Sequence, residues 1–466
     1  MSAGGGTVPA AELGRVHFIA IGGAGMSGIA RIMLKRGIAV SGSDAKESEL
    51  LGQLADLGAK VHVGHDAAYL GDADTVVVST AIRESNPELA AARARGLRVL
   101  HRSEALAALM AGRRAVAVAG THGKTTTTSM LTVALQRAGA DPSYCIGGQL
   151  VTTGLGADEG AGPVFVAEAD ESDGSFLRYT PAIAVVTNVE ADHLDNYGGF
   201  EKVKENFAAF VDRVEAGGTL VACADDPVVR ELAGHARGRG LRVVTYGEAP
   251  DADLRVTGFT PRGLGSEFEV TGAGPVRLAV PGRHYALNAA AAIAVARELG
   301  ADAGAVLAGL AAFGGAMRRL ERKGEAGGVE VFDSYAHHPT ELAADLAATR
   351  DYLAEKGGGR IVAVFQPHLY SRTRFFAAEF GAALGAAEVA VVLDVYGARE
   401  DPEPGVTGAL VADAVPAGTA TAYVPSGDDV PDAVAGLARP GDVVITLGAG
   451  DVTRLAPLIL ERLAAS

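Results

Sequence analysis

Cysteine, aromatic residues and positive charge are all scarce in this chain of 466 residues. Its two cysteines, Cys145 and Cys223, lie far apart and form no Cys-x-x-Cys motif, which supports neither a disulfide framework nor a zinc site. The formal net charge of -15 argues against a protein that binds nucleic acid or an anionic membrane, because both attract basic proteins. An anionic substrate would therefore have to meet local cations.

Long apolar runs are missing too. No stretch approaches the roughly 20 apolar residues that a membrane-spanning helix requires. The N-terminus lacks the basic segment and apolar core of a signal peptide. We therefore expect a soluble cytoplasmic protein, monomeric or weakly dimeric, with no membrane or nucleic-acid partner.

The residues that are abundant are typical of α/β domains. Hydrophobic residues make up 48% of the chain, and short apolar runs alternate with amphipathic stretches rich in Gly and Ala. The length favours about three domains. A helix ending near Met110 and a Gly-rich linker at 324–328 mark the expected boundaries, so we predict domains at 1–112, 113–323 and 324–466. Alternating residues with Gly and Pro at 251–280 predict antiparallel hairpins attached to a mainly parallel central sheet.

The strongest local signal is a glycine-rich loop between an apolar strand at 115–119 and a helix at 124–137. Backbone N–H groups of such a loop cradle phosphate, its lysine reaches the β- and γ-phosphates, and a threonine hydroxyl binds magnesium. The spacing departs from the full Walker pattern, because Val118 occupies one of its positions. The loop predicts an ATP site formed by Gly120, Thr121, His122, Gly123, Lys124, Thr125 and Thr126.

Two acidic segments, 168–173 and 188–195, follow further apolar strands. Ligands of α/β proteins bind at the carboxyl ends of strands, and Mg²⁺ prefers one or two carboxylates together with phosphate. Each segment alone is as readily a helix cap or a solvated turn. Three polar loops after strands of one sheet favour ATP and metal.

The first block has its own glycine-rich turn, Gly-Gly-Ala-Gly-Met-Ser-Gly at 22–28, and Asp44 ends the next strand. Alone, this pattern suggests NAD with Asp44 on a ribose hydroxyl. A glycine-rich turn at a helix N-terminus favours the binding of a diphosphate, and a UDP-sugar contains a diphosphate as NAD does. The candidate UDP-sugar-binding residues are Gly23, Ala24, Gly25, Met26, Ser27, Asp44, Ser79 and Thr80.

The third block carries two segments, 332–340 and 366–374, that are dense in cations and hydrogen-bond donors. They follow successive strands, which makes them candidates for binding a carboxylate or phosphate. The candidate amino-acid-binding residues are Tyr335, His337, His338, His368, Arg372 and Arg374.

Five motifs in this order resemble those of the Mur ligases: Gly-Thr-His-Gly-Lys-Thr-Thr-Thr, Glu-Ala-Asp-Glu-Ser-Asp, Asn-x-Glu-x-Asp-His-Leu-Asp, Tyr-x-His-His-Pro-Thr-Glu and Gln-Pro-His-x-Tyr-Ser-Arg-Thr-Arg. The resemblance covers essentially the whole chain from Val16, and the first glycine-rich turn is similar to that of the alanine-adding members. It implies a Rossmann-like N-terminal domain that binds a UDP-sugar, a P-loop-type central ATPase domain and a Rossmann-like C-terminal domain that binds the amino acid.

The resemblance also implies a reaction: ATP-dependent ligation of L-alanine to the lactyl carboxylate of UDP-N-acetylmuramate through an acyl phosphate, in peptidoglycan precursor synthesis. It implies ATP contacts from Asn288, Arg319 and Asp333. Family positions are altered at Tyr285, Leu320 and Ala336. The implied Mg²⁺ ligands are Thr125, Glu171 and His193, and the implied catalytic residues are Lys124, Glu171, His193, His337 and His338.

Four other readings fit part of the sequence. A ligase that adds a preformed tripeptide to the same UDP-sugar would use the same chemistry, and a folylpolyglutamate synthetase is a more distant relative of it. An NAD-dependent oxidoreductase would explain the first glycine-rich turn and leave the second without a role. A non-catalytic nucleotide-binding protein would require that Lys124 and the carboxylates do not converge.

Overall fold

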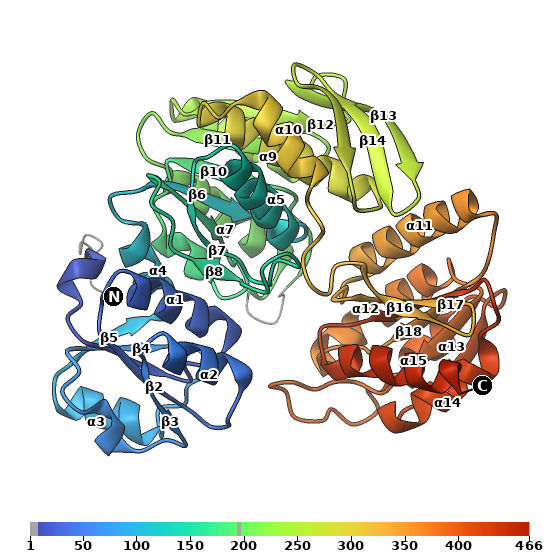
Figure 1. Cartoon of the computed structure of the whole chain (residues 1–466), viewed down its shortest axis with the longest axis horizontal. Coiled ribbons are helices and arrows are strands. Elements are labelled where there is room, and N and C mark those ends of the chain that lie inside the picture. The colour runs from blue at the N-terminus through green and yellow to red at the C-terminus, as the bar shows by residue number, and fades with distance from the viewer. Residues whose placement is uncertain (1–7, 193–196, 466) are drawn as a thin grey trace. The chain divides into compact units, whose positions relative to one another are not determined.

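The computed structural model describes residues 8–192 and 197–465 and confirms the predicted α/β class. The strands form three sheets (Figure 1). The chain divides into two compact units. One holds the chain up to residue 255 together with residues 288–309, and the other holds residues 256–287 and the chain from residue 310.

The first sheet is entirely parallel and has the strand order β3-β2-β1-β4-β5. Its central strand is buried on both faces, as covered parallel sheets require. The strands are β1 (Val16–Ile19), β2 (Val40–Asp44), β3 (Lys60–Val63), β4 (Thr75–Val78) and β5 (Arg98–His101). The helices are η1 (Ala10–Glu12), α1 (Ala24–Lys35), α2 (Glu49–Asp56), η2 (Ala67–Leu70), α3 (Pro87–Ala94) and α4 (Arg102–Met110).

The second sheet has the order β15-β14-β13-β12-β11-β10-β6-β9-β7-β8. The pairs from β13 to β7 are parallel, and the predicted hairpins are confirmed because β13, β14 and β15 pair antiparallel. The strands are β6 (Arg114–Ala119), β7 (Ser143–Cys145), β8 (Ala157–Asp158), β9 (Val164–Glu168), β10 (Ile183–Val186), β11 (Thr219–Cys223), β12 (Arg242–Gly247), β13 (Leu254–Arg262), β14 (Gly265–Val270) and β15 (Gly274–Leu278).

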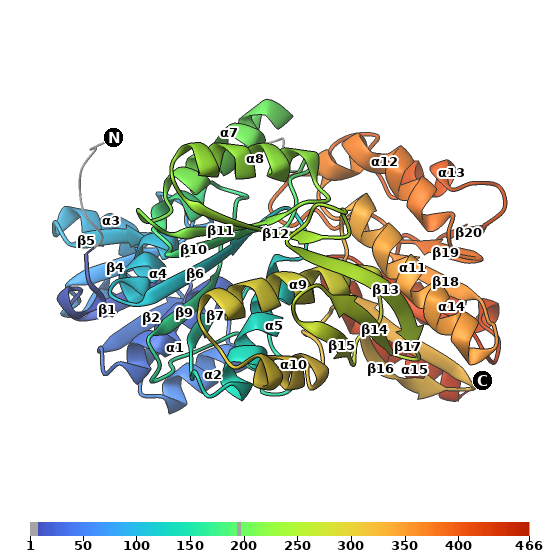
Figure 2. The same ribbon diagram turned by 90° about the horizontal axis from the view of Figure 1, so that it is seen from above.

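Helices cover both faces of this sheet. Figure 2 shows α7 and α8 on one face and α5 on the other. The helix predicted at 124–137 has these bounds in the structure. The helices are α5 (Lys124–Arg137), η3 (Ser175–Arg178), α7 (Phe200–Asp212), α8 (Pro227–Gly238), α9 (Arg283–Glu298) and α10 (Ala303–Ala311).

The third sheet has the order β16-β17-β21-β18-β19-β20 and is parallel except for the β16–β17 pair. The strands are β16 (Glu321–Ala326), β17 (Val329–Ser334), β18 (Ile361–Phe365), β19 (Val389–Val392), β20 (Ala420–Tyr423) and β21 (Val443–Leu447). The helices are α11 (Pro339–Lys356), α12 (Tyr370–Leu384), α13 (Ala409–Ala414), η4 (Gly427–Asp429), α14 (Val430–Leu437), η5 (Asp451–Arg454) and α15 (Leu455–Ala464).

Side-chain alternation along these strands separates two apolar layers. Val329 and Val331 of β17 pack with α14 and α15 in one core cluster. Phe332, whose side chain points to the opposite face, contacts Tyr352 of α11. The third sheet is therefore covered by helices on both faces.

The Gly-rich segment at 324–328 is not the linker that we predicted. Gly324 pairs with Val331 inside the β16–β17 hairpin, and Gly327 and Gly328 form its turn with φ of 58° and 72°. Glycines that supply positive φ to a tight turn look like linker glycines in a sequence. The third sheet therefore already includes Glu321–Ala326, which begins on the N-terminal side of the predicted boundary.

The helices that the structure describes do not include one that could span a membrane. Across residues 8–192 and 197–465, every helix is too short or too polar to cross a bilayer.

Candidate active site

The central glycine loop joins β6 to α5 as predicted, and two of its glycines are required by close contacts. Gly120 has φ 136°, and a Cβ there would lie 1.9 Å from Thr187 Oγ1. Gly123 caps α5 with φ 82°, and a Cβ there would lie 2.6 Å from Asn288 Oδ1. The backbone therefore turns into the helix N-terminus, whose N–H groups and dipole favour phosphate. Asn288, predicted to contact ATP, lies beside this loop.

Lys124 directs its ammonium group back over the loop. Nζ donates to the carbonyl oxygens of Gly120 at 2.6 Å and Thr121 at 3.0 Å, and to Glu171 Oε1 at 2.8 Å. Burial lowers the pKa of Lys124, but Glu171 together with the charges of Asp170 and Glu168 outweighs this effect, and the pKa is raised overall, so the side chain is charged at neutral pH. The predicted convergence of Lys124 with a carboxylate is present.

Glu171 is a buried acid of this site whose pKa is raised. Its side chain is 3% exposed, and burial raises its pKa to about 7, although Lys124 pulls the pKa down. Oε1 accepts from Lys124, whereas Oε2 is buried and has no hydrogen-bond partner among the described residues. A buried carboxylate oxygen without a donor is a fitting ligand for Mg²⁺, which binds through oxygen.

Thr125 lies beside a second carboxylate. Its Oγ1 donates to Glu168 Oε1 at 3.1 Å, and Glu168 Oε2 accepts from the backbone of Gly147 at 2.7 Å. Thr126, also predicted at the ATP site, is 5% exposed on the same helix. Glu168 and Glu171 thus bond to adjacent residues at the start of α5, and hydroxyl and carboxylate oxygens are groups that Mg²⁺ can bind.

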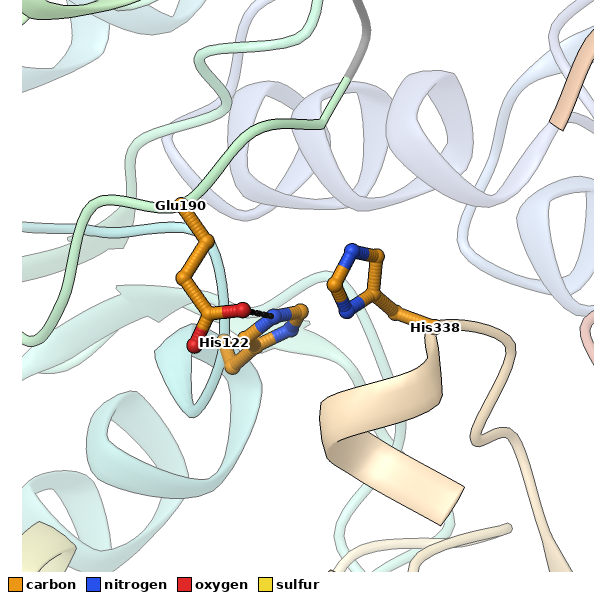
Figure 3. A group of neighbouring side chains, drawn as sticks. All are labelled: His122, Glu190 and His338. Carbon is orange, nitrogen blue, oxygen red and sulfur yellow. Dashed lines mark ion pairs between the residues drawn. The ribbon is translucent and has the colours of Figure 1, made fainter. Parts of the chain in front are cut away.

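The second acidic segment braces the same loop. Asn188 Oδ1 accepts from the backbone of His122 at 2.8 Å, and its Nδ2 donates to the His122 carbonyl at 3.1 Å. His122 Nε2 lies 3.5 Å from Glu190 Oε2, the ion pair drawn in Figure 3. His338, also labelled there, belongs to the other unit and is described with it. His193, predicted as a metal ligand and catalytic residue, lies outside the described residues.

Asp44, which we predicted to contact the UDP-sugar, holds the first glycine loop in this structure. Asp44 Oδ2 accepts from the backbone N–H of Gly22 at 2.9 Å. Gly23 caps α1, which continues through Ala24 and Gly25. Met26 and Ser27 are buried, with 3% and 8% exposure. The N–H groups of Met26 and Ser27 both donate to the Gly23 carbonyl at 2.9 Å, so these two residues contribute to the first turn of α1.

Ser79 and Thr80 follow β4, which is the neighbour of β1 in the sheet. The Ser79 carbonyl accepts from the N–H of Ile82 at 3.1 Å, so the segment is a turn. Because parallel strands end at one edge, this turn and the first glycine loop share that edge.

In the second unit, two predicted ATP contacts lie close to Tyr335. The guanidinium of Arg319 lies 5.2 Å from the Tyr335 ring, and its backbone carbonyl accepts from Tyr285 Oη at 2.8 Å. Asp333 is fully buried, and its two oxygens accept from Thr446 at 2.7 Å and from Thr453 at 2.6 Å. The carboxylate of Asp333 therefore already has two hydroxyl donors within this unit.

The histidines of this unit gather beyond the same strands. His337 lies 5.2 Å from Tyr335 and 6.2 Å from His368 between ring centroids. Arg372, which is 6% exposed, approaches His368 Nδ1 at 3.5 Å. Burial, and then Arg372, lower the pKa of His368 to about 4, so its imidazole is neutral at pH 7. The structure brings four of the six predicted amino-acid-binding residues together.

The other two residues make different contacts. His338 caps α11, accepts from Thr340 N at 3.4 Å and packs its ring 5.1 Å from Phe376. Arg374 is half-exposed and pairs with Glu403 at 3.1 Å. Arg374 therefore points to a surface carboxylate, as a solvated arginine commonly does.

Sequence reasoning missed several residues of these sites. Asn188 and Glu168 were seen only as members of acidic segments, although both contact the phosphate-loop helix or its entry. Arg318 has φ 59°, lies 4.8 Å from the Tyr335 ring and donates to Gly448 O at 2.6 Å. Tyr396 stacks on His368 at 5.8 Å. A short polar run signals the first two, but no local pattern signals the others.

Three family models match consecutive parts of the chain. The model described as Mur ligase family, catalytic domain, matches residues 15–114, and the Mur ligase middle domain matches residues 118–296. The model described as Mur ligase, glutamate ligase domain, matches residues 318–450.

Curated relatives are similar over nearly the full length. The UDP-N-acetylmuramate–L-alanine ligase of Thermobifida fusca is 60% identical over 97% of both chains, and that of Kineococcus radiotolerans is 61% identical over 97% of both. Among solved structures, the UDP-N-acetylmuramate-alanine ligase of Thermotoga maritima has a TM-score of 0.79 at 28% identity and covers 97% of this chain and 99% of its own. A murein peptide ligase from Psychrobacter arcticus has a TM-score of 0.70 at 25% identity, with the same coverage.

Proposed function

Since this chain belongs to the Mur ligase family, we propose that it joins L-alanine to the lactyl carboxylate of UDP-N-acetylmuramate with ATP as the energy source. The activity named for its full-length relatives supports this choice of substrates. The observation that carries the chemistry is the glycine loop in which Lys124 is held against Glu171. The product would enter peptidoglycan precursor synthesis in the cytoplasm, and the enzyme would act as a monomer or weak dimer.

The reaction proceeds in two steps. A lactyl carboxylate oxygen attacks the γ-phosphorus of ATP, the bond to the β–γ bridging oxygen breaks, and ADP leaves. The amine of L-alanine then attacks the carbonyl carbon of the acyl phosphate. The carbon–oxygen bond breaks, phosphate leaves with one former carboxylate oxygen, and the amine loses a proton to give the amide.

The phosphate loop provides positive charge for the first step. Lys124 exchanges its carbonyl partners for phosphate oxygens and offsets the negative charge that develops during transfer. Thr125, Glu168 and Glu171 would hold Mg²⁺, with His193 as the further predicted ligand. Bound there, Mg²⁺ would neutralise charge on the transferred group. Asn288, which lies against Gly123 of this loop, is assigned to ATP.

The C-terminal residues are assigned to the amino acid. Tyr335, His337, His368 and Arg372 form the group that would receive L-alanine, with the charge of Arg372 available for its carboxylate. His337 and His338 are the candidates for accepting the amine proton. Arg319 and Asp333 are assigned to ATP, and Gly23 to Ser27 with Asp44, Ser79 and Thr80 to the UDP-sugar.

The test is phosphate release from ATP and UDP-N-acetylmuramate in Mg²⁺, with one amine substrate added at a time. We expect L-alanine to give the fastest release, ahead of serine and glycine. Release only with the preformed tripeptide would contradict the choice of L-alanine and favour the tripeptide ligase; the fold of a murein peptide ligase is also similar. If no phosphate is released whichever of these amines is added, the proposed function is contradicted.

A further inference from the structure

The predicted diphosphate site at residues 22–28 contains no lysine or arginine of its own. A diphosphate bound to a chain with a net charge of -15 would be stabilised by a nearby cation. One arginine reaches this loop from another element. Arg102 is the first residue of α4, and a Cβ on Gly25 would lie 3.6 Å from its Nη1. This guanidinium nitrogen therefore lies against the first turn of α1.

The hydrogen bonds of Arg102 leave part of its guanidinium unused. Nη2 donates to Asp170 Oδ2 at 2.8 Å, and Asp173 lies 3.8 Å away. Within residues 8–192 and 197–465, Nε and Nη1 make no hydrogen bond. Neither atom is among the buried polar atoms that lack a partner, and the side chain is 21% exposed. Both nitrogens are thus open to a ligand, and Nη1 is the one beside Gly25.

Asp170 connects this arginine to the ATP site. It precedes Glu171, which holds Lys124. Two adjacent carboxylates of one loop therefore hold two cations, one beside each glycine loop. A purely structural arginine would be expected to direct more of its donors to the protein, as Arg360 does with contacts to Asp442 and Leu437 O.

We propose that Arg102 binds the diphosphate of the sugar nucleotide through Nη1 while Nη2 stays on Asp170, so that Arg102 links the sugar-nucleotide site to the carboxylate loop of the ATP site. The proposal rests on the proposed function and adds a positioning residue to its first substrate site. Charge-assisted bonds of this kind to phosphate are stronger than neutral ones and favour arginine for its planar fork.

The test is calorimetric binding of UDP, UDP-N-acetylmuramate and an unreactive ATP analogue to Arg102→Met. We expect the affinity for both uridine nucleotides to fall roughly 10- to 100-fold, the loss of one charged hydrogen bond, with ATP-analogue binding unchanged. Unchanged UDP affinity would overturn the proposal. A loss confined to UDP-N-acetylmuramate would also overturn it, because the arginine would then face the lactyl carboxylate.

Three further variants separate binding from folding. Arg113→Met removes another partly buried arginine of the same unit, which pairs with Glu159 at 2.7 Å, and should leave UDP affinity unchanged. Asp170→Asn frees Arg102 and should keep or tighten UDP binding. Arg102→Lys should restore part of the affinity, because it keeps the charge and loses the fork. If Arg102 only supports the fold, Arg102→Met and Asp170→Asn will lower stability alike and leave UDP affinity at the value of Arg113→Met.

The alanine-dependent release of phosphate distinguishes this proposal from the proposed function. If the wild-type protein releases phosphate and Arg102→Met has a normal KM for the sugar nucleotide, only the proposed role of Arg102 is contradicted. If Arg102 proves necessary for UDP binding but no amine leads to phosphate release, only the proposed function is contradicted.

Discussion

Two buried glutamates of the first unit show how similar ion pairs serve different ends. Glu88 of α3 is fully buried and accepts from His17 Nε2 at 2.6 Å, Ser43 Oγ at 2.7 Å and His65 Nδ1 at 2.8 Å. Glu171 is almost as buried, yet one of its oxygens has no partner in the described part of the chain.

The pKa values of the two acids move in opposite directions. Burial alone would raise the pKa of Glu88, but the hydrogen bonds from His17, Ser43 and His65 outweigh it and the pKa is lowered. Burial raises the pKa of Glu171 to about 7, because the lowering effect of Lys124 is too small to cancel it. A carboxylate whose two oxygens are both hydrogen-bonded stabilises the fold. A carboxylate with an oxygen that lacks a hydrogen bond, beside a phosphate loop, is able to bind a ligand.

The largest effect should come from Lys124→Met. We expect kcat to fall at least about 10³-fold, because a preorganised charge at the transferred phosphoryl group is lost. Stability should change little, since Glu171 without its partner takes up a proton. Steady-state kinetics and urea unfolding measure the two quantities. UDP-sugar affinity is the internal control, and its loss together with turnover would place Lys124 in the fold rather than in catalysis.

Glu88→Gln should give the reverse result. Removing one member of a buried, hydrogen-bonded pair costs about 3–5 kcal/mol, so the free energy of unfolding should drop by this order. The kcat of the folded variant should stay within a few-fold of wild type. Urea unfolding at pH 7 and saturating kinetics test both parts. A variant as stable as wild type would remove the basis of the comparison.

The stability difference between wild type and Glu88→Gln should also depend on pH. The pKa of Glu88 is lowered on folding, so its contribution is complete above the unfolded value near 4.5 and is lost as the pH falls through the folded pKa. The difference should therefore be larger at pH 7 than in acid and should shrink below about pH 4.5. Urea titrations at several pH values check this, and a difference that grows in acid would contradict the assigned direction.

The smallest effect should come from an exposed ion pair. Arg230 contacts both oxygens of Asp251 at 2.7 Å, and the two side chains are 44% and 64% exposed. Solvent and salt screen such pairs, so Asp251→Asn should leave the Tm unchanged within error at physiological salt. A fall in Tm comparable to that of Glu88→Gln would show that geometry, rather than burial, sets the value of an ion pair here.

The sequence predicts elements whose signal is local. The strand, glycine loop and helix around Lys124 follow from an apolar run, two turn glycines and a helix start within 25 residues, and α5 has its predicted bounds. The strands that we did not predict from the sequence lie at or next to sheet edges, where burial on one side weakens the apolar pattern: β3, β7, β8, β16 and β20.

Contacts between distant residues leave no such signal. His17 and Glu88 are 71 residues apart, and Arg102 and Asp170 are 68 apart. Each residue alone reads as a surface charge or a helix cap, because charged residues are mostly exposed. Only the folded chain shows that both oxygens of Glu88 are hydrogen-bonded, and that Arg102 keeps Nε and Nη1 available beside its bond to Asp170.

The most direct test of the ligation mechanism is to follow oxygen from the substrate carboxylate. UDP-N-acetylmuramate labelled with ¹⁸O in its lactyl carboxylate would be turned over with ATP and L-alanine, and the released phosphate analysed by mass spectrometry. The acyl-phosphate route predicts that each released phosphate carries one former carboxylate oxygen. Unlabelled phosphate, formed together with labelled amide product, would contradict it.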